Sequence, residues 1–190
     1  MKVITDFPLA FDSPDHLFPW GTARDNTTDL GFIVEIEHYF KNKKINMLDI
    51  GCSGGQLVVD FNRRGHKAIG IEGSDYSIKH NRANWPAYHN KLLFTCDASR
   101  PYKITEDDGS EIKFDLITAW ETIEHIHPDT LDTFFQNIVN HMHQDSIFCG
   151  SIALNEDVIQ GYVLHQSVFP AEKWMNEILP KYFKVNIMPF

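Results

Sequence analysis

The sequence predicts an α/β fold in which helices flank a doubly wound, mostly parallel sheet of six or seven strands. Its 190 residues suit one domain, since domains usually hold ~100–200 residues. Hydrophobic residues make up 43% and charged residues 23%, as in a globular chain. From residue 46 onward, short apolar segments alternate with amphipathic ones, which is typical of parallel strands joined by helices. We therefore expect a single domain over 1–190, with an N-terminal arm and helix over 1–44 and an α/β core over 45–190.

The N-terminal residues 1–28 are expected to be irregular, because prolines and a glycine interrupt regular structure there. Aromatic residues between these interruptions indicate an arm that packs on the domain as a cap. Asp29 can cap the helix that follows, since apolar residues recur at helical spacing over 30–40.

Strands and helices should then alternate along the core. The expected strands cover 47–50, 67–71, 92–96, 114–119, about 146–153 and 182–187. The expected helices cover 55–64, 75–84, 131–142 and 170–179. The third helix has the clearest pattern, because its apolar residues fall at i, i+3, i+4, i+7, i+8 and i+11. The polar stretch 103–111 should be a surface loop.

Composition argues against several classes of protein. With 17 basic and 26 acidic residues, the net charge of −9 disfavours broad nucleic-acid binding, which needs a basic surface. No apolar run approaches the ~20 residues of a membrane span, and the first residues lack the apolar stretch of a signal peptide. The three cysteines, Cys52, Cys96 and Cys149, are too few and too scattered for a disulfide framework. We therefore predict a cytoplasmic protein.

Ligand-binding residues are expected just after each strand, because ligands of such sheets bind outside the carboxyl ends of the strands. The first strand ends in the turn 51–55, whose small residues let a ligand approach backbone N–H groups. Glu72 ends the second strand and can accept both hydroxyls of a ribose, and Asp97 after the third can accept the amine of an adenine. Each feature alone also fits an ordinary turn or a solvated acid. The dinucleotide pattern Gly-x-Gly-x-x-Gly is absent, because Ser53 and Gln56 take two of its glycine positions.

Four segments resemble the motifs of class I S-adenosylmethionine-dependent methyltransferases. They are Met47–Gly55, Gly70–Ser74, Cys96–Ala98 and Phe114–Ile117. The resemblance covers roughly residues 30–188 and implies a Rossmann-like fold with S-adenosylmethionine as the cofactor. It identifies these cofactor-binding residues: Arg24, Asp49, Gly51, Ser53, Gly55, Glu72, Asp97, Ala98 and Trp120.

The resemblance also implies a role for each of these residues. Asp49 and the glycine turn would shape the methionine pocket, which Trp120 would line, and Arg24 would contact the cofactor carboxylate. Glu72 would hold the ribose, and Asp97 with Ala98 would flank the adenine.

The chain departs from the family pattern in two places. Ser53 replaces the middle glycine of the first motif, which leaves the geometry of that turn open. The family sheet ends with an antiparallel seventh strand, for which the chain up to Phe190 has little room. Either the sheet is shortened, or a strand comes from a partner, as in a homo-oligomer.

The sequence Glu121-x-x-Glu124-His125 follows the fourth strand. On a helical turn these three side chains would share one face, where they could bind a divalent cation such as Mg²⁺ or act as acid and base. The string resembles one in ubiquinone-pathway O-methyltransferases and in small-RNA 2′-O-methyltransferases, where it binds a divalent cation near the acceptor hydroxyl. By that resemblance, His165 is the candidate for a further ligand. A metal-free role with His125 as base, and a purely structural role, are the alternatives.

The expected function is methyl transfer to an oxygen of a small-molecule acceptor, with N-methylation left open. Glu121, His125 and His165 are the candidate catalytic residues, and His165 could equally be an ordinary loop residue. The loop over 154–170 should shape the acceptor pocket together with the N-terminal aromatic residues. An RNA 2′-O-methyltransferase and a non-catalytic S-adenosylmethionine-binding module are the alternatives, and the glycine spacing disfavours a nicotinamide oxidoreductase.

Overall fold

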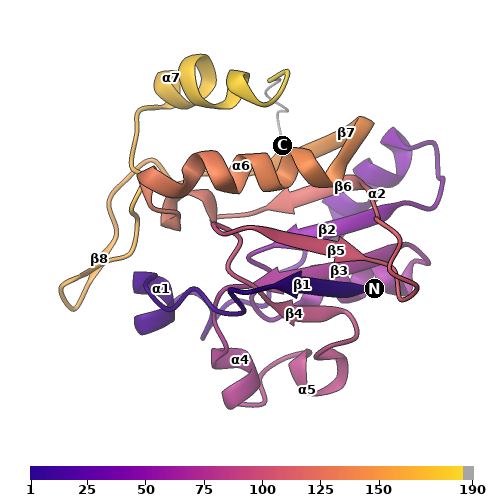
Figure 1. The fold of residues 1–190 in the computed structure, drawn as a ribbon, viewed down its shortest axis with the longest axis horizontal. Coiled ribbons are helices and arrows are strands. Elements are labelled where there is room, and N and C mark those ends of the chain that lie inside the picture. The colour runs from indigo at the N-terminus through magenta and orange to yellow at the C-terminus, as the bar shows by residue number, and fades with distance from the viewer. Residues whose placement is uncertain (186–190) are drawn as a thin grey trace.

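A five-stranded parallel sheet forms the centre of the computed structural model, which describes residues 1–185 (Figure 1). The strand order is β4-β3-β2-β6-β7. Their bounds are β2 Asn46–Ile50, β3 Lys67–Glu72, β4 Leu93–Thr95, β6 Phe114–Ala119 and β7 Met142–Gly150. β3 pairs with one side of β2 and β4 pairs with β3, whereas the next strand, β6, pairs with the opposite side of β2. The order therefore reverses between β2 and β6, and ligands bind at such reversal points in open α/β sheets.

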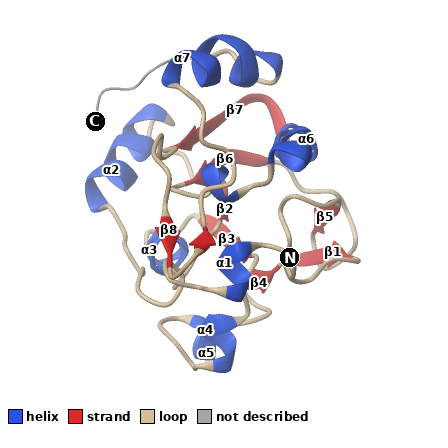
Figure 2. Cartoon of the chain, turned by 90° about the vertical axis from the view of Figure 1, so that its left-hand side faces the viewer, coloured by secondary structure: helices blue, strands red, loops and turns tan. Residues whose placement is uncertain are grey.

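Helices cover both faces of this sheet, as the sequence predicts (Figure 2). The helices α2 (Leu30–Tyr39) and α3 (Gln56–Arg63) pack on one face, where Met47 meets Ile33 and Phe61. The helix α6 (Leu131–His141) packs on the other, with Leu48 in the same apolar cluster as its phenylalanines. Adjacent strand residues thus point to opposite layers, as the period of a strand requires.

The structure corrects the prediction for two segments that were expected to be irregular. β1 (Lys2–Thr5) pairs antiparallel with β5 (Tyr102–Thr105), so the start of the arm and the start of the predicted 103–111 loop form a second, two-stranded sheet. The arm also contains the short helix α1 (Pro14–Leu17). A pairing between segments so far apart leaves no local signal in the sequence.

The predicted helix over 75–84 is also wrong in its extent. α4 covers only Tyr76–Lys79, and the separate helix α5 covers Trp85–Tyr88. Asn81 and Ala83 between them adopt positive φ values of 47° and 50°, which an α-helix cannot contain. Pro86 lies at the start of α5, where proline needs no N–H partner.

The last part of the chain differs from the prediction as well. α7 (Ala171–Lys173) continues as a π-helical turn over Trp174–Ile178 and a 3₁₀ turn over Leu179–Lys181. Of the strand predicted over 182–187, residues 182–185 are not extended in a sheet, and 186–187 lie outside the described residues. The central sheet therefore has five strands within residues 1–185 instead of the six or seven expected.

The segment after β7 folds over the carboxyl edge of the sheet and carries a small hairpin. β8 (Val158–Ile159) and β9 (Tyr162–Val163) are joined by two residues with positive φ, Gln160 and Gly161, as in a type I′ turn. Within residues 1–185, no helix has the length and hydrophobicity that a bilayer span requires.

Candidate active site

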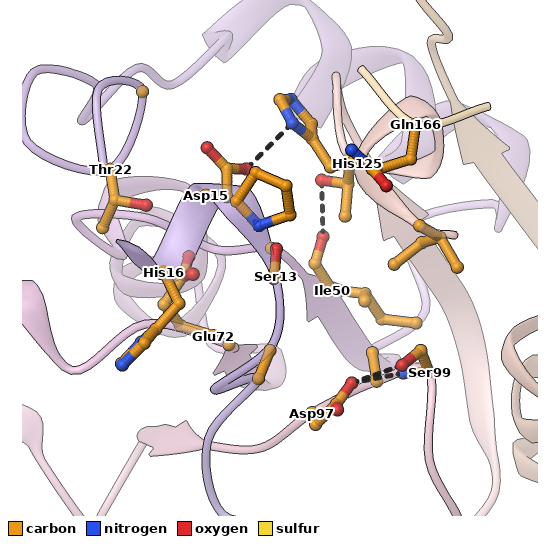
Figure 3. A pocket seen from close by; sticks show the side chains of 18 of the residues that line it. Ser13, Asp15, His16, Thr22, Ile50, Glu72, Asp97, Ser99, His125 and Gln166 are labelled. Atoms are coloured by element: carbon orange, nitrogen blue, oxygen red, sulfur yellow. Dashed lines mark hydrogen bonds and ion pairs between the residues drawn. The ribbon is translucent and has the colours of Figure 1, made fainter. Parts of the chain in front are cut away.

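A cavity of about 710 Å³ lies at the carboxyl edge of the sheet, next to the reversal between β2 and β6 (Figure 3). Its walls come from the turns after β2, β3, β4 and β6, from the N-terminal arm, and from the loop after β7. The cavity forms here because parallel strands deliver all their following turns to one edge.

The backbone conformation of the turn after β2 restricts which residue types can occupy it. Gly51 has a φ of 75°, and a Cβ atom there would lie 2.3 Å from Oγ1 of Thr122. Ser53 has a φ of 45°, which lies in the left-handed region that favours glycine. Ser53 thus adopts a backbone conformation typical of the glycine that it replaces in the family motif. Its side-chain hydroxyl donates to the Asp25 carbonyl at 2.7 Å, and its carbonyl accepts from the Trp85 indole at 2.7 Å. These bonds hold Ser53 in its strained conformation.

Two buried carboxyl groups lie at this turn. Glu72, at the end of β3, accepts the backbone N–H of Ser53 at 2.9 Å and that of Ser74 at 3.1 Å. Burial raises the pKa of Glu72 to about 7, against these hydrogen bonds. Asp49 in β2 accepts the Thr118 hydroxyl at 2.7 Å, and burial raises its pKa to about 7 as well. Glu72 lines the cavity, whereas Asp49 lies behind the wall and supports it.

The end of β4 and the arm form the wall around Asp97. The Asp97 N–H donates to the Phe7 carbonyl at 2.9 Å, and its Oδ1 accepts the Ser99 N–H and hydroxyl at 2.9 and 2.7 Å. The guanidinium of Arg100 lies 5.5 Å from the Phe7 ring centroid. Phe7 and Ala98 thus supply apolar surface beside a fixed carboxylate, a combination that suits a purine.

The turn after β6 does not have the predicted helical geometry. Only Ile123–His125 forms a 3₁₀ turn, and Glu121 precedes it with a φ of 45° and an exposed side chain. Glu121 lines the cavity but precedes this turn, so the helical turn on which a shared face of Glu121, Glu124 and His125 depended does not form.

Glu124 is fully buried and joins this turn to the loop after β7. Its backbone carbonyl accepts the N–H groups of Gln166 and Ser167 at 2.7 and 2.9 Å, and its Oε1 accepts that of Ala153 at 3.2 Å. Oε2 is buried and has no hydrogen-bond partner within the described residues. Burial raises the pKa of Glu124 above its ordinary value. An unpaired buried carboxylate oxygen is costly, which points to a ligand-binding role for Oε2.

Two imidazole rings lie beside Glu124, one from the turn and one from the loop. Nδ1 of His125 is 3.0 Å from Oδ2 of Asp15 and 3.2 Å from the Leu164 carbonyl, and Nδ1 of His165 is 2.6 Å from the Asn155 carbonyl. All these partners are acceptors, so a proton on each Nδ1 leaves the Nε2 lone pair free in the neutral ring. Burial lowers the pKa of His125, but the hydrogen bond with Asp15 and its charge outweigh burial and raise it overall.

The ligand atoms of Glu124, His125 and His165 lie within 4.8 Å of one another. One carboxylate and two imidazoles form a donor set that suits Mn²⁺, Fe²⁺ or Zn²⁺. Each ring has a partner at Nδ1, which would fix its orientation if Nε2 bound the ion. The residues therefore fit a divalent cation. Of the four candidate ligands, Glu124, His125 and His165 lie together, and Glu121 is not part of this group.

The structure brings most of the predicted site residues to the cavity wall. Those that line it are Gly51, Ser53, Glu72, Asp97, Ala98, Trp120, Glu121, His125 and His165. Gly55 and Asp49 lie behind it, and Arg24 is exposed, with its guanidinium 3.2 Å from the Trp20 ring centroid and a hydrogen bond to the Trp20 carbonyl. Asp15 and His16 of the arm also line the cavity, and the sequence does not predict them because no motif or periodicity surrounds them.

Comparison with known proteins gives consistent results. A family model described as a methyltransferase domain matches residues 23–181. A ubiquinone biosynthesis O-methyltransferase of Pelagibacter ubique (strain HTCC1062) is 29% identical over 136 residues, which are 70% of this chain and 52% of that protein. The mitochondrial ubiquinone biosynthesis O-methyltransferase of Bos taurus is 32% identical over 96 residues, 48% of this chain and 24% of that protein. The chain thus spans about half the length of such relatives, or less.

Among solved structures, Streptomyces venezuelae DesVI matches with a TM-score of 0.51 and 17% identity, over 78% of this chain and 64% of that one. At this identity the likeness concerns the fold. The family match begins at residue 23, so the arm residues that line the cavity up to Thr22 precede it.

Proposed function

The chain belongs to the methyltransferase-domain family of class I S-adenosylmethionine-dependent enzymes, and from that premise we propose that it transfers a methyl group to an oxygen atom of a small molecule. One observation carries the proposal: the turn after β2, Glu72 and Asp97 meet at the wall of a single cavity. Each of these three features alone also occurs in ordinary turns and at ordinary strand ends. Together they offer one site with a carboxylate for a ribose and another for an adenine amine.

The cavity residues suit S-adenosylmethionine, which when bound supplies a methyl group on a sulfonium leaving group. Each carboxylate oxygen of Glu72 accepts one backbone N–H and keeps a lone pair for a ribose hydroxyl. Phe7, Ala98 and Asp97 suit the adenine. Gly51 and Ser53 of the turn after β2 line the same cavity, where the methionine part of the cofactor would lie.

The charge of the cavity wall supports a small acceptor over RNA. Eight acidic residues line it and Arg100 is the one lysine or arginine among the described lining residues. The acidic residues are Asp12, Asp15, Asp25, Glu72, Asp97, Glu121, Asp129 and Asp157. A phosphate backbone needs cationic partners, so this wall would repel it. The same volume of about 710 Å³ must also hold cofactor and acceptor together.

The finer part of the proposal is that Glu124, His125 and His165 hold a divalent cation beside the acceptor. Its support is the unpaired, buried Oε2 of Glu124 and the two imidazoles whose Nδ1 atoms are already engaged. A bound cation would lower the pKa of the acceptor hydroxyl. In a metal-free mechanism, Nε2 of His125 accepts the hydroxyl proton directly. In either case the reaction depends on alignment of acceptor and methyl group, which the cavity walls provide.

Ligand binding tests the cofactor half of the proposal. S-adenosylhomocysteine at 100 times its Kd should stabilise the protein by about 2.7 kcal/mol in thermal unfolding, and NAD should have no effect. Stabilisation by NAD without stabilisation by S-adenosylhomocysteine would refute the assignment.

Substitution of Glu124 tests the acceptor half. Glu124→Gln should abolish Mn²⁺ binding measured by electron paramagnetic resonance and lower turnover far more than affinity for S-adenosylhomocysteine. Glu156→Gln is the matched control, because Glu156 is an exposed carboxylate of the adjoining loop outside the cavity wall. Equal loss of turnover and of cofactor affinity in Glu124→Gln would contradict an acceptor-side role.

A further inference from the structure

Asp15 is the one residue of the arm that forms an ion pair with the Glu124–His125–His165 cluster among the described residues. Its Oδ2 lies 3.0 Å from Nδ1 of His125, and Figure 3 shows the carboxylate and the ring facing each other. Both side chains are partly shielded, with 27% of Asp15 and 18% of His125 exposed. The contact joins two walls of the cavity that are far apart in the sequence.

This contact determines how the His125 ring is held. Nδ1 has only acceptors beside it, the Asp15 carboxylate and the more distant Leu164 carbonyl at 3.2 Å. A proton on Nδ1 satisfies both, whereas a proton on Nε2 would place the Nδ1 lone pair against two oxygens. A carboxylate in this position fixes the tautomer and the orientation of an imidazole and increases the basicity of its other nitrogen.

The arm itself is anchored on both sides of Asp15. The Ala10 N–H donates to the Gly73 carbonyl at 2.9 Å, and the Phe7 carbonyl accepts the Asp97 N–H at 2.9 Å. After Asp15, the ring of Phe18 stacks on that of Tyr162 at 5.4 Å between centroids. These contacts tie the arm to the turn after β3, to the turn after β4 and to the β8–β9 hairpin. They therefore hold the backbone that carries Asp15 in place beside His125.

We propose that Asp15 is a positioning residue that fixes the His125 ring with its proton on Nδ1, so that Nε2 is available to the acceptor-side site. The proposal rests on the proposed function for what Nε2 then does. It assigns a role in that site to Asp15, which precedes the part of the chain that the family model matches.

Three variants test the proposal at pH 8.5. Asp15→Ala removes the carboxylate, and Asp15→Asn keeps an oxygen acceptor without the charge. Asp6→Ala is the control, because Asp6 is an exposed aspartate of the same arm outside the cavity wall. Long-range ¹H–¹⁵N correlation spectra report which nitrogen of His125 carries the proton. In the wild type and in Asp6→Ala the proton should be on Nδ1, whereas Asp15→Ala should populate both tautomers and Asp15→Asn should fall between them.

Two binding measurements on the same proteins complete the test. Affinity for Mn²⁺ should fall about 10–100-fold in Asp15→Ala, the usual effect of losing the partner of a metal-bound histidine. Affinity for S-adenosylhomocysteine should stay within about threefold of the wild type, which shows that the variant is folded.

The outcomes separate this proposal from the function on which it rests. If the wild type binds S-adenosylhomocysteine but not Mn²⁺, the metal assignment fails, and the His125 spectra alone decide the role of Asp15. An unchanged His125 tautomer in Asp15→Ala overturns the proposal. Joint loss of S-adenosylhomocysteine and Mn²⁺ binding in both Asp15 variants also overturns it, because Asp15 would then support the fold as a whole.

Discussion

Glu72→Gln should stabilise the ligand-free protein at alkaline pH while weakening cofactor binding. Burial raises the pKa of Glu72 from an ordinary 4.5 to about 7. At about 1.4 kcal/mol per pKa unit, the ionised carboxylate therefore costs the folded protein about 3 kcal/mol well above pH 7. Because the folded pKa of this acid is raised, the cost is present above pH 7 and disappears as the pH falls toward 4.5.

The amide of glutamine removes that cost but has only one oxygen. Either the Ser53 or the Ser74 N–H, both now bound to Glu72, loses its acceptor, at about 1 kcal/mol. The net expectation is a gain of about 2 kcal/mol in the free energy of unfolding at pH 8.5, and no gain or a slight loss at pH 5. Affinity for S-adenosylhomocysteine should fall about 10–100-fold, since charge-assisted hydrogen bonds to two hydroxyls are lost.

Urea unfolding at the two pH values and calorimetric titration with S-adenosylhomocysteine measure these effects. Glu35→Gln serves as the control, because Glu35 is an exposed carboxylate on α2, away from the cavity. Destabilisation of Glu72→Gln by the same amount at both pH values would refute the argument from burial. Unchanged affinity for S-adenosylhomocysteine would remove Glu72 from the cofactor site.

Two further substitutions test the turn after β2 and the acid-sensitive contacts of α2. Gly51→Ala should lower the free energy of unfolding by about 3 kcal/mol, because it combines left-handed strain with a clash at Thr122. Gly109→Ala is the control and should lower it by only about 1 kcal/mol, because Gly109 has a φ of 87° but open space around its Cα. Equal losses for the two variants in urea unfolding would exclude the clash. The hydrogen bond with Arg64, helped by His66, lowers the pKa of Glu37 to about 2, so its stabilising effect is present above pH 4.5 and is lost as the pH falls through 2. Glu37→Gln should therefore destabilise the protein at neutral pH and progressively less in acid, and a constant difference between the two proteins across that range would contradict this.

The central sheet could be predicted from the sequence because its signals are local. A strand buried on both faces of a parallel sheet appears as a short apolar run, and the first three runs here are each followed directly by a glycine or an acid. The positions of Glu72 and Asp97 at the cavity follow directly, since parallel strands place their ends at one edge. The pairing of β1 with β5 could not be predicted, because strand partners distant in the sequence are chosen by tertiary packing.

The proposed acceptor-side site was harder to predict from the sequence, for two physical reasons. Its geometry depends on a turn whose backbone conformation the sequence does not specify: Glu121 adopts a positive φ, so the helical spacing that would unite it with Glu124 never applies. Its remaining partners come from other segments, since His165 lies on the loop after β7 and Asp15 on the arm. Contacts between segments this far apart follow no fixed spacing along the sequence, so no motif reveals them.

The buried carboxyl groups would make this edge of the sheet favour cationic ligands. Glu72, Asp49 and Glu124 all have pKa values raised by burial, so each makes the empty protein less stable when ionised. A cation about 5 Å from one of them gains about 3 kcal/mol at an effective dielectric constant of about 20. That gain is of the same size as the cost at Glu72 worked out above. A cationic sulfonium or a divalent cation would therefore offset the cost of burying these charges, whereas an anionic ligand would add to it.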